Sequence, residues 1–276
     1  MVIFNVRVNN RVTAHNTEAS MLNTILKATL LTGLISLSSQ LHAEHGSNVQ
    51  QVVKAITAPS IDGSNNDLAW QNAKWHQINQ AIIGELPKND DFSGRYKVVW
   101  TEDKLYILAE IIDDILADRH AHPLDSYWND DAFEILIDED HSGGNHQQNY
   151  NAFAYHIALD NQAVDIDSSG KPRLLNDHIQ SIWKRSPDDS NKIIWEVSMD
   201  IYPDTFKDHY TEGELPTKAI SLEKGKKMGF MLAYCDNDGG KERESFITSF
   251  DIKAVDGDKN RAYIDASVFE TIILVD

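Results

Sequence analysis

Cysteine is nearly absent from this chain: Cys235 is the only one in 276 residues. A single thiol excludes an intrachain disulfide, so stability must come from burial of apolar side chains and from any bound metal. Cys235 directly follows the apolar run Phe230 to Tyr234, which predicts a buried and unreactive thiol. Long hydrophobic runs are missing too, since the run from Ala28 to Leu37 is shorter than the roughly 20 residues that span a bilayer.

Positive charge is also scarce. Lysine and arginine number 25 against 43 aspartate and glutamate residues, which gives a formal net charge of −18. Such a surface repels phosphate backbones, so nucleic acid is excluded as a probable partner. The acidity is compatible with a neutral ligand or with bound cations, and it also serves solubility by itself.

Residues 21–43 have the layout of an export signal. The basic Lys27 precedes the apolar run, and small and polar residues follow it up to Ala43. This order predicts a secretory signal peptide with Met21 as the true start and cleavage after Ala43; a buried core helix is the alternative. The mature chain, residues 44–276, is then a single domain in the periplasm or outside the cell.

Long amphipathic helical patterns are absent, and short runs rich in β-branched and aromatic residues alternate with turn residues. These runs are residues 96–100, 105–112, 132–137, 153–159, 179–184, 193–201, 227–234, 245–250 and 269–275. The spacing predicts an all-β fold, an antiparallel β-sandwich of the jelly-roll or immunoglobulin-like kind with few short helices. Residues 202–222, with two prolines and a glycine, are predicted to form a connecting loop with at most one helical turn.

Alternation within two of these runs assigns side chains to faces. Phe133, Ile135 and Ile137 share one face, and Glu134 takes the other. In the run 153–159 the aliphatic side chains again share a face, and His156 points away from them. If the aliphatic faces pack inward, a carboxyl group and an imidazole lie together on the opposite face, where they can hydrogen-bond a ligand.

Catalytic signatures are missing as well: there is no nucleophile elbow, zinc-protease helix, phosphate loop or Gly-rich dinucleotide turn. His120 and His122 are two residues apart in a loop-like segment, which favours solvated histidines over zinc ligands. Glu134 with Asp131 or Asp138 forms a carboxyl pair of the kind that hydrolyses glycosidic bonds, but such pairs arise by chance in so acidic a chain.

Acidic clusters stand at the ends of several predicted strands. They are Asp113-Asp114, Asp130-Asp131, Asp138-Glu139-Asp140 and Asp236-Asn237-Asp238. Hard cations such as calcium need several oxygen ligands, and clusters of this kind supply them, although none matches an EF-hand loop. The clusters therefore predict a structural calcium ion, with solvated turn residues as the alternative.

Trp128 is the aromatic residue most suited to a ligand. It lies in the polar loop Asp125 to Asp131, whereas Trp100, Trp183 and Trp195 lie inside apolar runs. Sugars present apolar C–H faces to aromatic rings and hydroxyl rims to carboxyl and amide groups. A tryptophan in a polar loop beside a carboxyl-bearing strand therefore points to carbohydrate binding.

Five segments in order carry a family resemblance. They are Ile61-Asp62-Gly63 with Trp70, 98–106 (VVWTEDKLY) with Asp113, 128–138 (WNDDAFEILID), 194–197 (IWEV) and 260–269 (NRAYIDASVF). Together they resemble the family 9 carbohydrate-binding modules, often attached to xylanases, over nearly the whole mature chain, from about Ala58 to Val275.

The resemblance implies a non-catalytic β-sandwich whose binding slot holds a sugar between two aromatic rings. Trp128 falls on the first ring, Glu134 on the sugar-binding glutamate and Asn260 on a hydroxyl-binding asparagine. Tyr263 stands where the pattern has a second tryptophan, and His156 where an arginine usually supplies a basic contact.

The resemblance also implies partners and a metal. The expected ligand is a sugar or chain end of a xylan- or cellulose-like plant polysaccharide, and a separate glycoside hydrolase or uptake protein is the expected partner. Members of the family bind calcium, and Asp113 and Asp138 are the first candidates for its ligands.

Three other interpretations stay open. The first is a haem-binding relative of the same sandwich, which needs axial ligands such as Met228, Met231 or His156. The second is an enzyme that uses Glu134, and the third is an assembly or surface protein with a vestigial slot.

Overall fold

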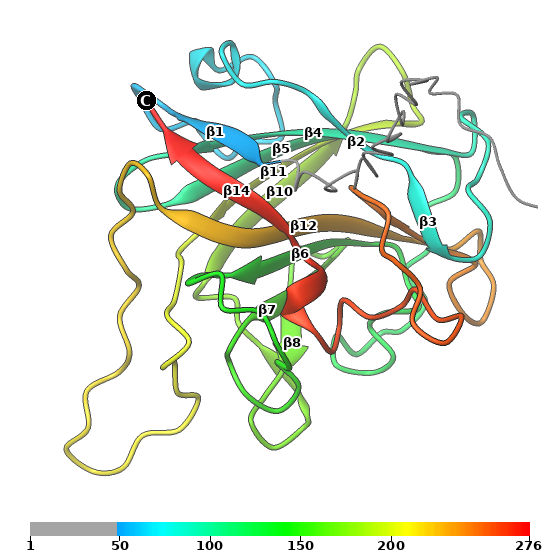
Figure 1. The fold of residues 1–276 in the computed structure, drawn as a ribbon. Helices are drawn as coiled ribbons and strands as arrows, with labels where there is room; N and C mark the ends of the chain where they lie inside the picture. The colour runs from blue at the N-terminus through cyan, green and yellow to red at the C-terminus, as the bar shows by residue number, and fades with distance from the viewer. Residues whose placement is uncertain (1–48) are drawn as a thin grey trace, which may run out of the picture. The chain divides into compact units, whose positions relative to one another are not determined.

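The computed structural model describes residues 49–276, so the predicted signal peptide and its cleavage site lie outside the described residues. The described chain is built of strands joined by loops, with two single-turn 3-10 helices, η1 (Leu68–Trp70) and η2 (Ala266–Val268) (Figure 1). The strands are β1 (Gln50–Lys54), β2 (His76–Ile78), β3 (Gln80–Ile83), β4 (Phe92–Trp100), β5 (Leu105–Asp113), β6 (Ala132–Asp138), β7 (Phe153–Ala158), β8 (Ala163–Ile166), β9 (Pro172–Leu174), β10 (Ile179–Arg185), β11 (Lys192–Met199), β12 (Lys227–Asp236), β13 (Ser245–Thr248) and β14 (Glu270–Val275).

The strands form the two layers of a β-sandwich, as predicted. One layer has the order β10-β11-β5-β4 and the other β14-β12-β6-β7-β8-β9, and β1 pairs in parallel with both β4 and β14 (Figure 1). All other strand pairs are antiparallel. The rings of Phe133 and Trp195 lie 5.7 Å apart across the layers, and those of Phe92 and Tyr234 lie 5.1 Å apart.

The alternation of apolar residues decides which side chains fill the space between the layers. Phe133, Ile135 and Ile137 of β6 belong to this core, as do Leu105 and Ile107 of β5. Because side chains alternate along a strand, the intervening residues of β6 face outward. The predicted assignment of faces in β6 is therefore confirmed.

The outward face of β6 and β12 is not open to solvent, which differs from the sequence-based expectation. A second apolar cluster covers it, in which Leu136 and Met231 pack against Ala262 and Phe269 of the C-terminal segment. That segment, residues 250–269, lies across the sheet and turns its outer face into the floor of a cavity. Residues 202–222 form the predicted irregular loop, with turns but no helix (Figure 1).

Within residues 49–276, neither of the two 3-10 helices approaches the length or apolarity needed to cross a bilayer.

Candidate functional site

A cavity of about 400 Å³ lies on the outer side of β6 and β7. This volume falls within the range of about 300–1,000 Å³ that is common for small-molecule sites. Its lining includes all five predicted sugar-binding residues, which are Trp128, Glu134, His156, Asn260 and Tyr263. The fold thus brings together side chains from one loop, two strands and the C-terminal segment.

The two predicted clamping rings are exposed, unlike the rings of Tyr127 and Phe246 in the same lining. Trp128 is 42% exposed and Tyr263 is 47% exposed, whereas most of the other aromatic side chains are buried. A turn places Trp128: Ser126 has a φ of 52° and its carbonyl accepts a hydrogen bond from the Asn129 amide. The buried Tyr127 supports Trp128 from behind, edge to face at 5.1 Å. Two open aromatic faces are therefore available to a ligand in the same cavity.

The C-terminal segment that carries Asn260 and Tyr263 is anchored to the loop after β6. His146 Nε2 lies 2.7 Å from the Ala262 carbonyl oxygen, and the His146 amide donates to the Ile264 carbonyl at 3.0 Å. Burial lowers the pKa of His146, so the ring is a neutral hydrogen-bond donor there. These contacts hold the second ring at a fixed place on the cavity rim.

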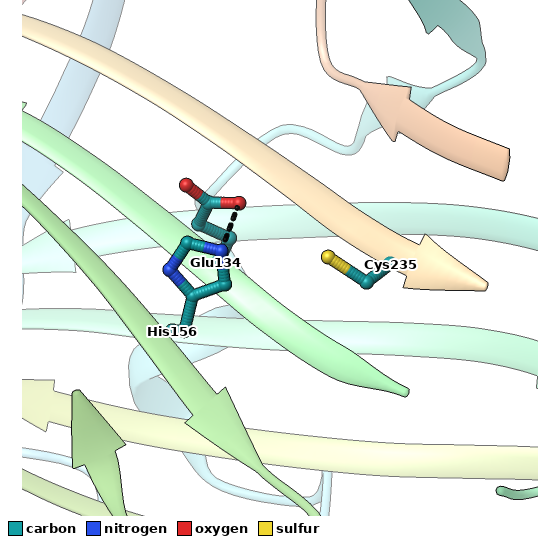
Figure 2. A group of neighbouring side chains, drawn as sticks. All are labelled: Glu134, His156 and Cys235. Atoms are coloured by element: carbon teal, nitrogen blue, oxygen red, sulfur yellow. Dashed lines mark ion pairs between the residues drawn. The ribbon is translucent and has the colours of Figure 1, made fainter. Parts of the chain in front are cut away.

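Glu134 and His156 form the floor of the cavity. They are directly opposite residues of β6 and β7, with Glu134 Oε2 3.1 Å from His156 Nε2 (Figure 2). The two atoms are close but poorly aligned, and Oε2 has no hydrogen-bond partner among residues 49–276. Burial raises the pKa of Glu134 to about 8 and lowers that of His156 to about 3. At neutral pH both groups are therefore uncharged, and Oε2 is free to bond a ligand hydroxyl.

Arg243 and Asp165 also line the cavity and were not predicted from the sequence. Arg243 Nη1 donates to Cys235 Sγ at 3.1 Å, and its guanidinium lies 4.4 Å from the centre of the Phe246 ring. Asp165 accepts hydrogen bonds from the amides of Ala154 and Ile166, and burial raises its pKa to about 7. Arg243 lies in a charged loop typical of solvated turns, so only its proximity in the fold reveals it.

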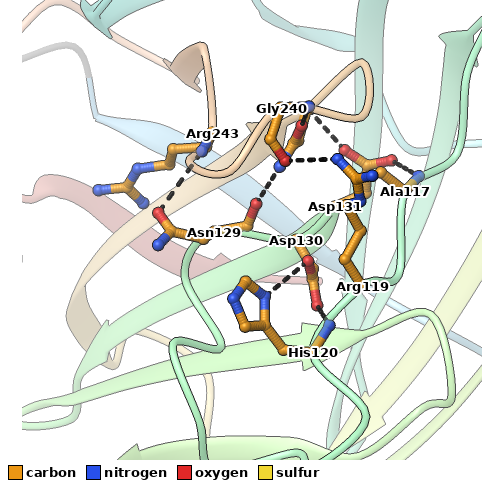
Figure 3. Close-up of polar contacts among 9 residues, drawn as sticks. Ala117, Arg119, His120, Asn129, Asp130, Asp131, Gly240 and Arg243 are labelled. Carbon is orange, nitrogen blue, oxygen red and sulfur yellow. Dashed lines mark hydrogen bonds and ion pairs between the residues drawn. The ribbon is translucent and has the colours of Figure 1, made fainter.

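Three buried carboxyl groups form a second cluster at the end of β6 nearest Trp128. Oxygen atoms of Asp113, Asp131 and Asp236 lie within 4.8 Å of one another. Asp131 accepts from the amides of Ala117 at 2.6 Å and Asn237 at 2.8 Å (Figure 3). Asp236 Oδ2 is buried and has no hydrogen-bond partner in the described chain.

This cluster fits a bound cation. Burial raises the pKa of Asp131 to about 9, that of Asp236 to about 8 and that of Asp113 to about 6. Three adjacent carboxyl groups cannot all ionise without a counter-charge, and an orphaned buried oxygen needs a partner. The carboxyl groups of the partly buried Asp91 and the exposed Asp238 and Glu244 form a neighbouring group.

The two predicted metal residues do not share this site. Asp113 belongs to the cluster, whereas Asp138 lies at the opposite end of β6 and accepts from the Gly143 amide at 2.7 Å. The other residues considered for a metal take different places. His120 contacts Asp130 at 2.9 Å (Figure 3). Met228 packs between the layers, away from His156, whereas Met231 lies on the outer face of the sheet, the side that carries His156.

Comparisons with known proteins agree with this geometry. A model of the family described as "Carbohydrate family 9 binding domain-like" matches residues 61–276. A carbohydrate binding module of family 9 from Caldicellulosiruptor kristjanssonii, in complex with cellotriose, superposes with a TM-score of 0.59 at 19% identity over 82% of this chain and 94% of that one. A putative carbohydrate-binding protein from Bacteroides uniformis superposes with a TM-score of 0.51 at 10% identity, covering 82% and 98%.

Curated relatives are much longer than this chain. Endo-1,4-beta-xylanase A of Thermotoga neapolitana is 33% identical over 92 residues, which is 33% of this chain and 8% of the xylanase. Endo-1,4-beta-xylanase C of Paenibacillus barcinonensis is 22% identical over 217 residues, which is 79% of this chain and 16% of the xylanase. The likeness therefore concerns one module of these proteins, and the activity of the whole xylanases does not follow for this chain.

Proposed function

Since the chain belongs to the carbohydrate family 9 binding domain-like family, we propose that it is an exported, non-catalytic carbohydrate-binding protein. Its ligand is a sugar or chain end of a xylan- or cellulose-like polysaccharide, held in the cavity between Trp128 and Tyr263. A separate glycoside hydrolase or an uptake protein would act on the same polysaccharide in the periplasm or outside the cell.

One observation carries the proposal: five side chains far apart in sequence line one cavity, with two half-exposed rings among them. The rings of Trp128 and Tyr263 offer apolar faces to a sugar ring and exclude water from it. Glu134, His156 and Asn260 offer polar atoms that can bond the hydroxyl rim. This combination of aromatic faces and polar groups suits a sugar ring.

The carboxyl groups support binding better than hydrolysis. A glycosidase needs two free carboxyl groups, separated by about 5–10 Å across the scissile bond. Asp165, the second acid of the cavity, already accepts two backbone hydrogen bonds, and Asp131 accepts two more outside it. Asp138 lies at the far end of β6. Glu134 therefore has no unengaged carboxyl partner in the cavity.

Titration calorimetry with cellotriose and xylotriose tests the proposal. We expect Trp128→Ala and Tyr263→Ala each to weaken binding by about 1–3 kcal/mol, by analogy with the loss of one stacked base from an aromatic side chain. Tyr210→Ala is the matched control, because Tyr210 is a similarly exposed ring in the 202–222 loop, outside the cavity. Identical binding heats for the wild type and Trp128→Ala would exclude the cavity as the sugar site.

A second proposal concerns calcium. We propose that Asp113, Asp131 and Asp236 hold one calcium ion, because they supply closely spaced buried oxygens and Asp236 Oδ2 lacks a partner. The ion would neutralise the cluster at the base of the loop that carries Trp128. Calcium is then a structural support of the cavity rather than a ligand of the sugar.

A further inference from the structure

Arg243 is the cation of the proposed sugar cavity, and it lacks an anionic partner. Its guanidinium donates to the thiol of Cys235 and lies over the ring of Phe246. No carboxylate oxygen of residues 49–276 comes within 4.0 Å of it. A largely enclosed guanidinium normally forms an ion pair, because an unpaired charge loses hydration without compensation.

Among the arginines of residues 49–276 only Arg95 contacts a carboxylate within 4.0 Å, but Arg243 is the one that lines the cavity. Arg95 is exposed to solvent, and its Nε donates to Glu110 Oε2 at 2.9 Å. Because Arg243 lines the cavity and contacts only a thiol and an aromatic ring there, it is placed to receive an anion from a ligand.

The cavity floor is better suited to an anion than to a metal ion. Glu134, His156 and Cys235 offer ligand atoms within 4.8 Å of one another (Figure 2), which is metal-like spacing. However, Arg243 donates to the Cys235 thiol and holds a permanent positive charge beside it. That charge opposes the entry of a second cation and attracts a negative group.

Neither carboxyl group of the cavity competes for the guanidinium. Asp165 engages the backbone amides of Ala154 and Ile166 with its two oxygens. Burial raises the pKa of Glu134 to about 8, so this side chain is mostly protonated at neutral pH. A ligand carboxylate would thus meet a guanidinium that no carboxyl group of the cavity already occupies.

We propose that the sugar bound in this cavity is a uronic acid, with its ring between Trp128 and Tyr263 and its carboxylate paired with Arg243. This inference rests on the proposed function and narrows its ligand to acidic saccharides. A planar guanidinium matches a carboxylate with two parallel hydrogen bonds, which gives both strength and orientation. Neutral sugars would occupy the same rings but leave Arg243 unpaired.

Calorimetry on the full chain at pH 7 tests the proposal with three probes: glucuronate, its uncharged methyl ester and glucose. We expect glucuronate to bind at least about tenfold more tightly than the ester or glucose, as a charged hydrogen-bonded pair predicts. Arg243→Met removes the charge at similar volume and should abolish this preference. Arg243→Lys keeps the charge without the planar fork and should retain part of it.

Arg119→Met is the matched control. Arg119 is exposed outside the cavity, and its Nη1 donates to the Gly240 carbonyl oxygen at 2.9 Å, so this variant loses the same charge from contact with the same loop (Figure 3). It should keep the preference for glucuronate, and thermal melting establishes that each variant is folded.

Two results would overturn the uronate inference while leaving sugar binding intact. One is equal binding of glucuronate and its ester by the wild type. The other is an equal loss of affinity for all three probes in both Arg243 variants. If none of the probes, nor cellotriose or xylotriose, binds the wild type, the proposed function fails together with the inference.

Discussion

At the scale of single residues, the cavity depends on groups whose charge is suppressed by burial. Trp128, Glu134, Asn260 and Tyr263 were predictable, because they lie in recognisable sequence segments and carry aromatic or polar side chains suited to sugars. Arg243 was not predictable, since its neighbours in sequence are charged and exposed. Only its position in the cavity marks it as a candidate binding residue. Local pattern identifies a residue type; the surroundings that decide its charge come from distant segments.

Glu134→Gln should stabilise the protein increasingly as the pH rises. Burial raises the pKa of Glu134 to about 8 from an ordinary value of 4.5, so the folded state keeps a proton that the unfolded chain releases. The stability contributed by this group is present below pH about 4.5 and is lost as the pH rises to about 8. Glutamine does not titrate, so its advantage over the wild type should grow across that window in thermal melts. A constant difference from pH 5 to 9 would show that Glu134 is ionised in the fold.

At the scale of elements, the long strands were predictable and most of the short ones were not. β4, β5, β6, β7, β10, β11, β12, β13 and β14 were each expected near their observed positions. β2 and β9 have three residues each, and β3 and β8 have four, which is too short for an alternating pattern to be recognised. β13 also has four residues, but it lies within the longer run 245–250 and was expected for that reason. β1 was not predicted for another reason. It pairs in parallel with β4 and β14, which are far apart in sequence, and a local pattern does not reveal such pairing.

Glu196 of β11 ties the segment before η1 to the sandwich. Its Oε2 accepts from the amides of Asp62, Gly63 and Ser64, and its Oε1 accepts from Trp70 Nε1 at 3.1 Å. Gly63 has a φ of 73°, which lets three successive amides converge on one oxygen.

Glu196→Gln should lower the free energy of unfolding by about 2–4 kcal/mol, because an amide NH₂ would face backbone donors and a charged acceptor would be lost. Urea denaturation measures the change. Glu223→Gln, at an exposed position, is the control and should differ from the wild type by less than about 0.5 kcal/mol. If Glu196→Gln lowers the free energy of unfolding by no more than this control does, the hydrogen bonds of Glu196 contribute little to stability.

At the scale of the whole molecule, repulsion between negative charges destabilises the fold, and bound cations reduce that repulsion. The formal net charge is −18, and carboxyl groups concentrate where β5 and β12 end and β6 begins. Without a cation, burial raises the pKa values of Asp131 and Asp236 to about 9 and 8. The stability that these two carboxyl groups contribute in their protonated form is therefore lost as the pH rises from about 4 to about 9.

Calcium should therefore raise the melting temperature more at pH 8 than at pH 6, because ions and protons compete for the same oxygens. At about 100 times its dissociation constant, calcium would add about 2.7 kcal/mol of stability. Asp236→Asn should be more stable than the wild type in a chelator at pH 8 and less stable in calcium. Sodium chloride at equal ionic strength is the control for screening, and equal effects of the two salts would contradict a specific site.

The parallel seam made by β1 has a consequence for how the chain reaches its native state. Val52 of β1 pairs with Leu274 of β14, so the two layers are stitched along one side by segments from opposite ends of the described chain. A ribosome-bound polypeptide cannot complete that seam until β14 has been synthesised. Pairings between segments that are far apart in sequence slow folding, because the chain loses loop-closure entropy before the paired strands make stabilising contacts. The two layers of the nascent chain therefore remain unjoined along β1 until β14 has been synthesised.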